Sequence, residues 1–307
     1  MKLLVKLNFR APLHIGSSTL GEEDTYDYAP SDTLFSALCH AYLGAFGTPA
    51  LEELLGRFDG SPPFLISSAF PYHEDTLFLP LPRVEPKERP EREEHGDRKL
   101  LKQTSWVSLE NFGRLLRGAD LELPDDLGPQ LPRKELLPRV ALDRNDSSSS
   151  IYYVRRAAFP ENGGLWTILD VRDESLEAPL RQTFHLLGDM GLGGERTMGC
   201  GFFEPEFGDV PPVLSQHLEG TAKPYVALSR VGGEESVGAV DRYTLVESRG
   251  WMSSPTGLQR KRKSVFFFGE GSSFKDRATG RLLDVTPQDG PDHNVYRYGF
   301  GMYAGSV

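Results

Sequence analysis

The chain has little cysteine, no long hydrophobic run and no excess of positive charge. Cys39 and Cys200 are its only cysteines in 307 residues, and their separation suits neither a disulfide framework nor a zinc site. No charge-free apolar run approaches the roughly 18 residues that a membrane-spanning helix needs. Residues 1–9 alternate like a strand and lack the apolar core of a signal peptide. We therefore expect a soluble, cytoplasmic protein with no membrane partner, no metal and no cofactor.

The net charge of −10 at pH 7 argues against a protein that coats nucleic acid unaided. Proteins with that role usually carry a large basic field over their surface. Any contact of this chain with nucleic acid is therefore expected to be local and to depend on a few basic groups.

The segment Gly191-Leu-Gly-Gly-Glu-Arg-Thr-Met-Gly-Cys-Gly201 is the most informative stretch of the chain. Glycines permit close backbone approach, successive N–H groups can form a nest for an anion, and the Arg196 guanidinium suits phosphate. The segment follows a helical pattern and precedes a strand pattern, the reverse of a Walker or Rossmann loop, and it contains neither of their motifs. We interpret it as a site for a polyanion and not for a nucleotide cofactor, with a glycine-rich turn as the alternative.

Hydrophobic periodicity predicts an α+β fold with ferredoxin-like element order in the first two thirds of the chain. The expected order is a strand, a helix capped within Pro30-Ser-Asp-Thr33, two hairpins, a second helix and a final strand. The expected ranges are 2–9, 31–46, 64–70 with 76–79, 151–157 with 166–172, 175–190 and 201–207. This predicts an N-terminal domain over residues 1–208, with insertions at about 83–102 and 118–150. The second insertion is interpreted as a long irregular connection, and residues 221–307 as a strand-rich second domain.

Two groups of polar residues in the first domain are candidates for RNA chemistry or RNA contact. His14 follows the first strand, where an imidazole can act as general acid or base on a ribose-phosphate. No spaced tyrosine or lysine completes a catalytic set, so a polar loop residue is the simpler interpretation. Several guanidinium groups, those of Arg139, Arg144 and the Arg155-Arg156 pair, surround a flexible connection. They are expected to position phosphates or to form ion pairs with Asp143 and Asp146.

One basic run stands out in this acidic chain. Arg260-Lys-Arg-Lys263 follows Trp251, so groups that stack on bases and groups that pair with phosphates are interleaved. This combination favours single-stranded RNA, and a solvated hairpin loop with a buried tryptophan is the alternative. The aromatic residues between Tyr296 and Tyr303 do not match an RNA-recognition signature in register and are expected to be strand core.

Three pieces of sequence together resemble the RAMP superfamily of CRISPR-associated proteins. They are Leu13-His-Ile-Gly16 with Ser31-Asp-Thr-Leu-Phe-Ser-Ala-Leu38, Leu142-Asp-Arg144 before Ile151-Tyr-Tyr153, and the glycine segment 191–201. The first helix, Gly269-Glu-Gly271 and Tyr296-Arg-Tyr-Gly299 narrow the resemblance to the subunit of type III-A effector complexes that holds the 5′ handle of the CRISPR RNA.

The resemblance implies two ferredoxin-like (RRM-like) domains, the second degraded, in an antiviral ribonucleoprotein. It implies three partners: the CRISPR RNA 5′ handle, a large polymerase-like subunit and an adjacent backbone RAMP subunit. It also implies no nuclease activity. The RNA-binding residues expected from the patterns and the resemblance are His14, Gly16, Arg139, Arg144, Gly191, Gly193, Gly194, Glu195, Arg196, Thr197, Gly199, Trp251, Arg260, Lys261, Arg262 and Lys263.

Two other functions remain open at this point. One is a metal-independent CRISPR RNA endoribonuclease that uses His14. The other is a scaffold whose glycine loop contacts protein.

Overall fold

A computed structural model of the chain describes residues 1–16, 24–84, 104–119, 130–142, 149–252, 260–290 and 293–307. The first two thirds of the chain form a seven-stranded sheet with the order β5-β4-β3-β8-β1-β9, and β2 also pairs with β8. These strands are β1 (Lys2–Phe9), β2 (Phe64–Ile66), β3 (Phe70–His73), β4 (Thr76–Pro80), β5 (Trp106–Ser108), β8 (Gly163–Val171) and β9 (Phe203–Asp209). The helices are α1 (Ser31–Phe46), α2 (Thr48–Gly56), α4 (Leu109–Leu116) and α5 (Glu177–Met190), and α5 is preceded by the short η2 (Glu174–Leu176).

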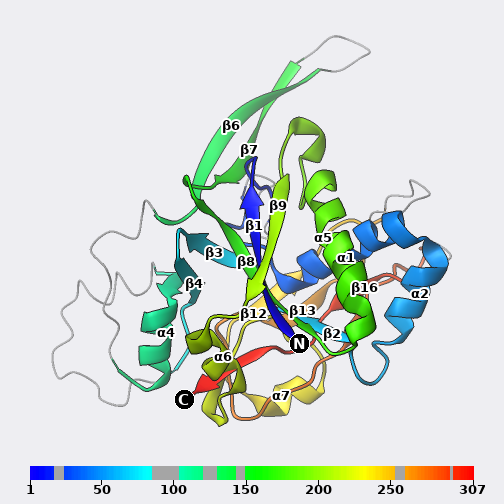
Figure 1. Ribbon diagram of the computed structural model, residues 1–307. Helices are drawn as coiled ribbons and strands as arrows, with labels where there is room; N and C mark the ends of the chain where they lie inside the picture. The colour runs from blue at the N-terminus through cyan, green and yellow to red at the C-terminus, as the bar shows by residue number, and fades with distance from the viewer. Residues whose placement is uncertain (17–23, 85–103, 120–129, 143–148, 253–259, 291–292) are drawn as a thin grey trace.

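The centre of this sheet confirms the predicted ferredoxin-like α+β fold. If β2 and β3 are taken as one interrupted strand, the spatial order β9-β1-β8-β3 places the fourth strand beside the first and the third beside the second. α1 and α5 lie together on one side of these strands (Figure 1). One predicted hairpin was misplaced, because β4 pairs with β3 and not with the stretch that begins at Phe64.

A long two-stranded ribbon projects from the body of the molecule (Figure 1). It pairs β6 (Arg133–Leu142) with β7 (Ser149–Ala158). The predicted hairpin between residues 151–157 and 166–172 is therefore wrong, and the second insertion is not irregular throughout. Pro138 and several charges within β6 conceal the strand pattern, because proline and charged residues are uncommon in central strands. A free ribbon tolerates them since it is exposed on both faces.

Apolar side chains gather on one face of this ribbon. In its register Val140 pairs with Ile151 and Pro138 with Tyr153, so these side chains share a face. Val140, Ile151 and Tyr153 are all exposed. The ribbon therefore exposes an apolar face to solvent, which is unusual in a protein that binds no partner.

The C-terminal third is rich in short strands, as predicted. A four-stranded sheet has the order β11-β14-β10-β17, and two hairpins pair β12 with β13 and β15 with β16. The bounds are β10 (Ala222–Ala227), β11 (Val240–Arg242), β12 (Leu245–Ser248), β13 (Val265–Phe268), β14 (Ser273–Phe274), β15 (Leu282–Asp284), β16 (Tyr296–Tyr298) and β17 (Tyr303–Ser306). Helix α6 (Pro212–Glu219) precedes them, and α7 (Glu235–Ala239) lies among them.

The two halves share one hydrophobic core. The rings of Phe35 on α1 and Tyr298 on β16 lie 5.0 Å apart, and those of Phe58 and Phe300 lie 5.6 Å apart. Tyr298 and Phe300 are buried, which confirms that these aromatics are core residues. The hydroxyl of Tyr298 accepts a hydrogen bond from the N–H of Ile66 at 3.0 Å. These contacts bury the junction between the C-terminal third and the rest of the chain inside the core.

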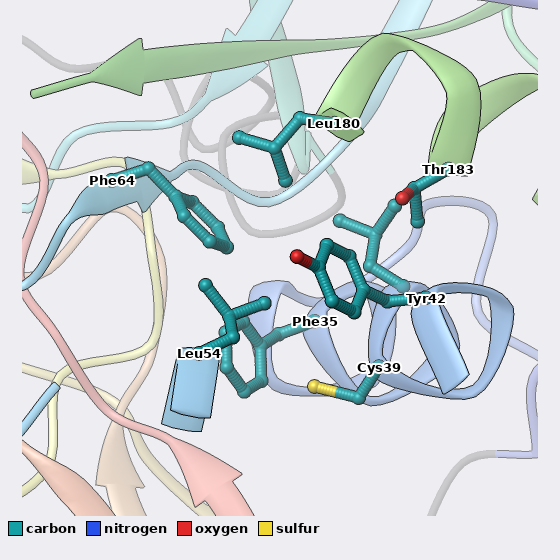
Figure 2. Close-up of a pocket in the computed structure, with 8 residues that line it drawn as sticks. Phe35, Cys39, Tyr42, Leu54, Phe64, Leu180 and Thr183 are labelled. Carbon is teal, nitrogen blue, oxygen red and sulfur yellow. The ribbon is translucent and has the colours of Figure 1, made fainter. Parts of the chain in front are cut away.

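A small cavity of about 10 Å³ lies between α1, α2, β2 and α5 (Figure 2). Phe35, Tyr42, Phe64 and Leu180 are among its lining residues, so the space is apolar and of the size of one water molecule. Cys39 also lines it, and burial raises the pKa of this thiol to about 12. This cavity is a packing defect and offers neither room for a ligand nor a reactive thiol.

Candidate nucleic-acid interface

The glycine loop is closed at its base by backbone contacts. The N–H of Leu192 donates to the carbonyl of Gly201 at 2.9 Å, and the N–H of Gly201 donates to that of Pro12 at 2.8 Å. Gly201 has φ +85°, and a Cβ there would stand 2.1 Å from the carbonyl oxygen of Leu192. Only glycine fits this position, so the sequence needs it for close approach as well as for the turn.

Some backbone N–H groups at the tip of the loop form hydrogen bonds within the loop itself. Glu195 has φ +54° and precedes the single turn η3 (Arg196–Met198), and Gly199 has φ +86°. The N–H groups of Met198 and Cys200 donate to the carbonyl of Glu195 at 2.9 and 3.2 Å. The predicted row of free amides is therefore shorter than the glycine count suggests. The side chains of Arg196 and Thr197 are exposed.

His14 anchors this loop to the segment after β1. Its carbonyl accepts a hydrogen bond from the N–H of Gly194 at 2.8 Å, and its ring packs against Gly194. Its Nδ1 lies 2.6 Å from the carbonyl oxygen of Arg155 on β7, so Nδ1–H donates and Nε2 is left as the acceptor nitrogen. His14 thus joins the loop, the first strand and the ribbon at one point. Gly16 lies two residues further on and is exposed.

Two arginines of the ribbon lie close to the loop. Arg139 and Arg156 fall on the same face of the ribbon in the observed register. Burial raises the pKa of Cys200 in the loop, while the positive charges of Arg156 and Arg139 lower it. Arg156 also lies between Arg155, whose carbonyl oxygen contacts His14, and Ala157, which pairs with Leu13, so this end of the ribbon lies beside the anchor of the loop. Arg156 pairs with Glu135 at 3.0 Å, whereas Nε of Arg139 is buried and has no hydrogen-bond partner among the described residues.

The sequence placed Arg155 and Arg156 among the guanidinium groups around this connection, but Arg156 was not named as an expected RNA contact. Because neighbouring strand residues point to opposite faces, one of two adjacent arginines in a ribbon has to face the loop. Arg144 lies outside the described residues.

His40 on α1 is a second residue that the sequence did not indicate. Burial lowers its pKa, and the positive charges of Arg196, Arg297 and His293 lower it further. The charge of the exposed Arg196 side chain therefore affects His40 on α1.

The basic hairpin differs from one of the two expectations. Trp251 is 60% exposed, so the alternative of a buried tryptophan is wrong, and Nζ of Lys261 lies 5.5 Å from its ring centroid. Arg262 is turned back to donate to the carbonyl of Arg249, so its guanidinium supports the hairpin. Arg260, Lys261 and Lys263 are the exposed cations of the run.

The described residues contain no group of three or more His, Cys, Asp or Glu that is able to hold a metal ion. None of the helices in the described ranges is long and apolar enough to cross a bilayer.

Comparisons with known families agree with this architecture. One family model, described as the RAMP superfamily, matches residues 6–204, and another, described as the CRISPR Csm4 C-terminal domain, matches residues 221–306. A CRISPR system Cms protein Csm4 from Thermococcus onnurineus (strain NA1) is 31% identical over 283 residues, which cover 89% of this chain and 90% of that protein. The protein of the same name from Streptococcus thermophilus is 27% identical over 297 residues, covering 93% and 92%.

Solved structures give the same result. A chain from the crystal structure of a Csm1-Csm4 cassette in complex with cA4 is similar at a TM-score of 0.68 with 26% identity, covering 100% of this chain and 98% of that chain. A chain from a Csm3-Csm4 subcomplex of a type III-A CRISPR-Cas interference complex matches at a TM-score of 0.69 with 17% identity and full coverage of both chains, a likeness of fold alone.

Proposed function

Since this chain belongs to the Csm4 family of the RAMP superfamily, we propose that it is the subunit of a type III-A CRISPR effector complex that binds the 5′ handle of the CRISPR RNA. In this role it has no catalytic activity and caps one end of the assembly. It docks the large polymerase-like subunit and the adjacent backbone RAMP subunit, and it acts in antiviral defence.

The observation that carries the RNA-binding proposal is the convergence of three separate segments on the glycine loop. His14 holds the loop through its backbone, while Arg139 and Arg156 approach from the ribbon. In this position the guanidinium groups, with Arg196, bind handle phosphates. Trp251 with Lys261 then supplies a stacking surface for an unpaired base.

Two features support the proposed partners. Relatives of this fold have been crystallised as a Csm1-Csm4 cassette and as a Csm3-Csm4 subcomplex. The exposed apolar face of the β6–β7 ribbon also suits burial against another protein subunit.

The experiment that tests the proposal compares Arg196→Ala with Arg172→Ala. Arg172 is also exposed, but it follows β8 at the end of the sheet far from the glycine loop. Each tagged variant is purified from cells that express the whole locus, and the small RNAs that it retains are sequenced. We expect Arg196→Ala to recover its partner subunits with several-fold less RNA that carries repeat-derived 5′ ends, and Arg172→Ala to match the wild type. Unchanged RNA in Arg196→Ala would remove Arg196 from the site, and RNA-free complexes of the wild-type protein would favour the scaffold function.

A second candidate function is the metal-independent endoribonuclease. It draws support from the free acceptor nitrogen Nε2 of His14 beside the loop. Incubation of the purified protein with repeat RNA in EDTA tests it directly. Cleavage that disappears in His14→Ala would establish this activity, and intact RNA would reject it.

A further inference from the structure

A buried ionic cluster joins the two halves of the chain around Asp32 in the first turn of α1. Nη1 of Arg230 donates to Oδ1 of Asp32 at 3.0 Å, and the hydroxyl of Ser248 donates to Oδ2 at 2.8 Å. Nη1 of Arg297 lies 3.6 Å from Oδ2 and donates to the carbonyl oxygen of Asp32 at 2.9 Å. Asp32 is fully buried and both arginines are nearly so. The three side chains that reach Asp32 from outside α1, those of Arg230, Ser248 and Arg297, all come from the C-terminal third.

Glu270 completes the cluster from the other side. It accepts hydrogen bonds from the hydroxyls of Ser68 at 2.5 Å and Tyr28 at 3.1 Å, and it lies 3.7 Å from Nε of Arg230. Two carboxylates thus balance two guanidinium groups. Because removing charges from water offsets most of their attraction, such a cluster contributes more to a defined geometry than to net stability.

The cluster is connected to the glycine-loop site. The guanidinium of Arg230 lies over the ring of Tyr26 at 5.5 Å, and the N–H of Tyr26 donates to the carbonyl of Ile15 at 2.9 Å. Ile15 directly follows His14, whose carbonyl holds Gly194. Arg230 therefore lies two contacts away from the anchor of the glycine loop.

The same carboxylate is connected to the basic hairpin. Ser248 is the last residue of β12, three residues before Trp251. Its hydroxyl bond to Asp32 attaches the base of the hairpin to the first turn of α1. Asp32 is thus the residue on which the supports of both candidate RNA-binding elements meet.

We infer that Asp32 and Arg230 form a positioning pair that fixes the spacing between the glycine loop and the Trp251 hairpin, so that the two contact the RNA a set number of nucleotides apart. This inference rests on the proposed function, in which both elements contact the CRISPR RNA. Neither Asp32 nor Arg230 touches RNA in this role.

The test is photocrosslinking in the complete effector complex. CRISPR RNA of the same locus carries 4-thiouridine at one handle position at a time, and crosslinked peptides are identified by mass spectrometry. In the wild type we expect residues 191–201 and residues 249–263 to crosslink at two distinct nucleotides. In Asp32→Asn the loop crosslinks should stay at their nucleotide, while the hairpin crosslinks should fall at least several-fold or spread to neighbouring nucleotides.

Three further variants make the result specific. Ser248→Ala removes only the attachment of the hairpin and should reproduce the hairpin effect even if Asp32→Asn fails to fold. Arg230→Lys keeps a charge beside Asp32 and should restore more of the wild-type pattern than Arg230→Met. Asp173→Asn is the control, because it breaks an ion pair with Arg57 that lies wholly within the first two thirds of the chain.

The outcomes separate the two proposals. Hairpin crosslinks of unchanged position and yield in folded Ser248→Ala and Asp32→Asn would overturn the positioning role. Wild-type crosslinks to the loop but not to the hairpin would also overturn it and would leave handle binding intact. Wild-type crosslinks to neither peptide would overturn handle binding itself.

Discussion

The carbonyl oxygen of His14 accepts a hydrogen bond from the N–H of Gly194 at 2.8 Å, and this bond attaches the glycine loop to the segment that follows β1. The neighbouring Gly193 makes the approach possible. It has φ +88°, and a Cβ on it would stand 2.3 Å from the same carbonyl oxygen. The geometry of the loop therefore depends on the absence of a side chain at this position.

Gly193→Ala should displace the loop from His14. We expect a loss of about 2–3 kcal/mol in the free energy of unfolding, from the clash and the left-handed backbone together, and weaker RNA retention. Gly199→Ala is the matched control, because Gly199 has φ +86° but nothing within 4 Å of its Cβ position. It should lose only about 1 kcal/mol. Denaturant unfolding measures both, and equal losses would show that the approach to His14 is unimportant.

Arg139→Ala tests the role of the Arg139 guanidinium on the ribbon. If Arg139 contacts a phosphate, its removal should reduce the slope of log affinity against log salt concentration by about 0.7, the value for one contact to a single strand. Titrations of CRISPR RNA into the full chain at several salt concentrations measure this slope. Arg172→Ala should leave it unchanged. An unaltered slope in Arg139→Ala would assign the arginine to support of the ribbon.

Gly113 in α4 lies against the buried histidine His217. His217 on α6 is 2% exposed, and its Nδ1 lies 3.0 Å from the carbonyl oxygen of Gly305. A Cβ on Gly113 would stand 2.7 Å from Nε2 of this ring. We expect Gly113→Ala to lose about 1–3 kcal/mol through overpacking, despite its better helix propensity.

Gly56→Ala provides the comparison for this prediction. Gly56 also lies in a helix, α2, and nothing lies within 4 Å of its Cβ position. Its substitution should be neutral or stabilise by up to about 1 kcal/mol. Thermal or denaturant unfolding distinguishes the two, and a stabilising Gly113→Ala would mean that α4 moves freely relative to His217.

Asp32 should make stability depend on acid pH. Burial alone raises the pKa of Asp32, but the charges of Arg230 and Arg297 and the hydrogen bonds to the carboxylate outweigh it, so the pKa is lowered. A carboxyl whose pKa is lower in the folded state stabilises that state above its ordinary pKa, and this contribution is lost as the pH falls through the folded-state pKa. The wild type should therefore lose this contribution progressively below about pH 4.

Asp32→Asn should be less stable at neutral pH by about 3–5 kcal/mol, because it leaves buried arginine charge uncompensated. Its stability should vary less over the acid range. The free energy of unfolding measured as a function of pH checks both statements. Parallel curves for the two proteins would contradict the assigned role of the carboxylate.

The sequence predicted the central fold because its signals were local. Alternation in β1 and the helical stripes of α1 and α5 depend on each segment alone, and their order sufficed for a ferredoxin-like assignment. The pairing of the strands was harder to predict from the sequence. The partner of β7 is β6, whose proline and charges conceal it, and nothing in residues 151–157 indicates which strand lies beside them.

The candidate site was predicted in part for a similar reason. The glycines and Arg196 of the loop indicated an anion-binding site from the sequence. The position of Arg156 beside this loop depends on the register of the ribbon, which the sequence does not give. Ser31 and Asp32 were expected to cap α1 with their side chains. Instead no side chain caps the helix, and these two residues turn inward to meet Arg230, a contact with a residue about two hundred positions away.

The shared core between the halves constrains how this chain can diversify. Phe35 packs against Tyr298 and Phe58 against Phe300, so a change of volume on one side has to be matched by a change on the other. A chimaera that takes its C-terminal third from a relative, joined near residues 208–221, would bring together core surfaces whose side-chain volumes do not match. Chimaeras of this family should therefore tolerate exchange of the projecting ribbon far better than exchange at that junction.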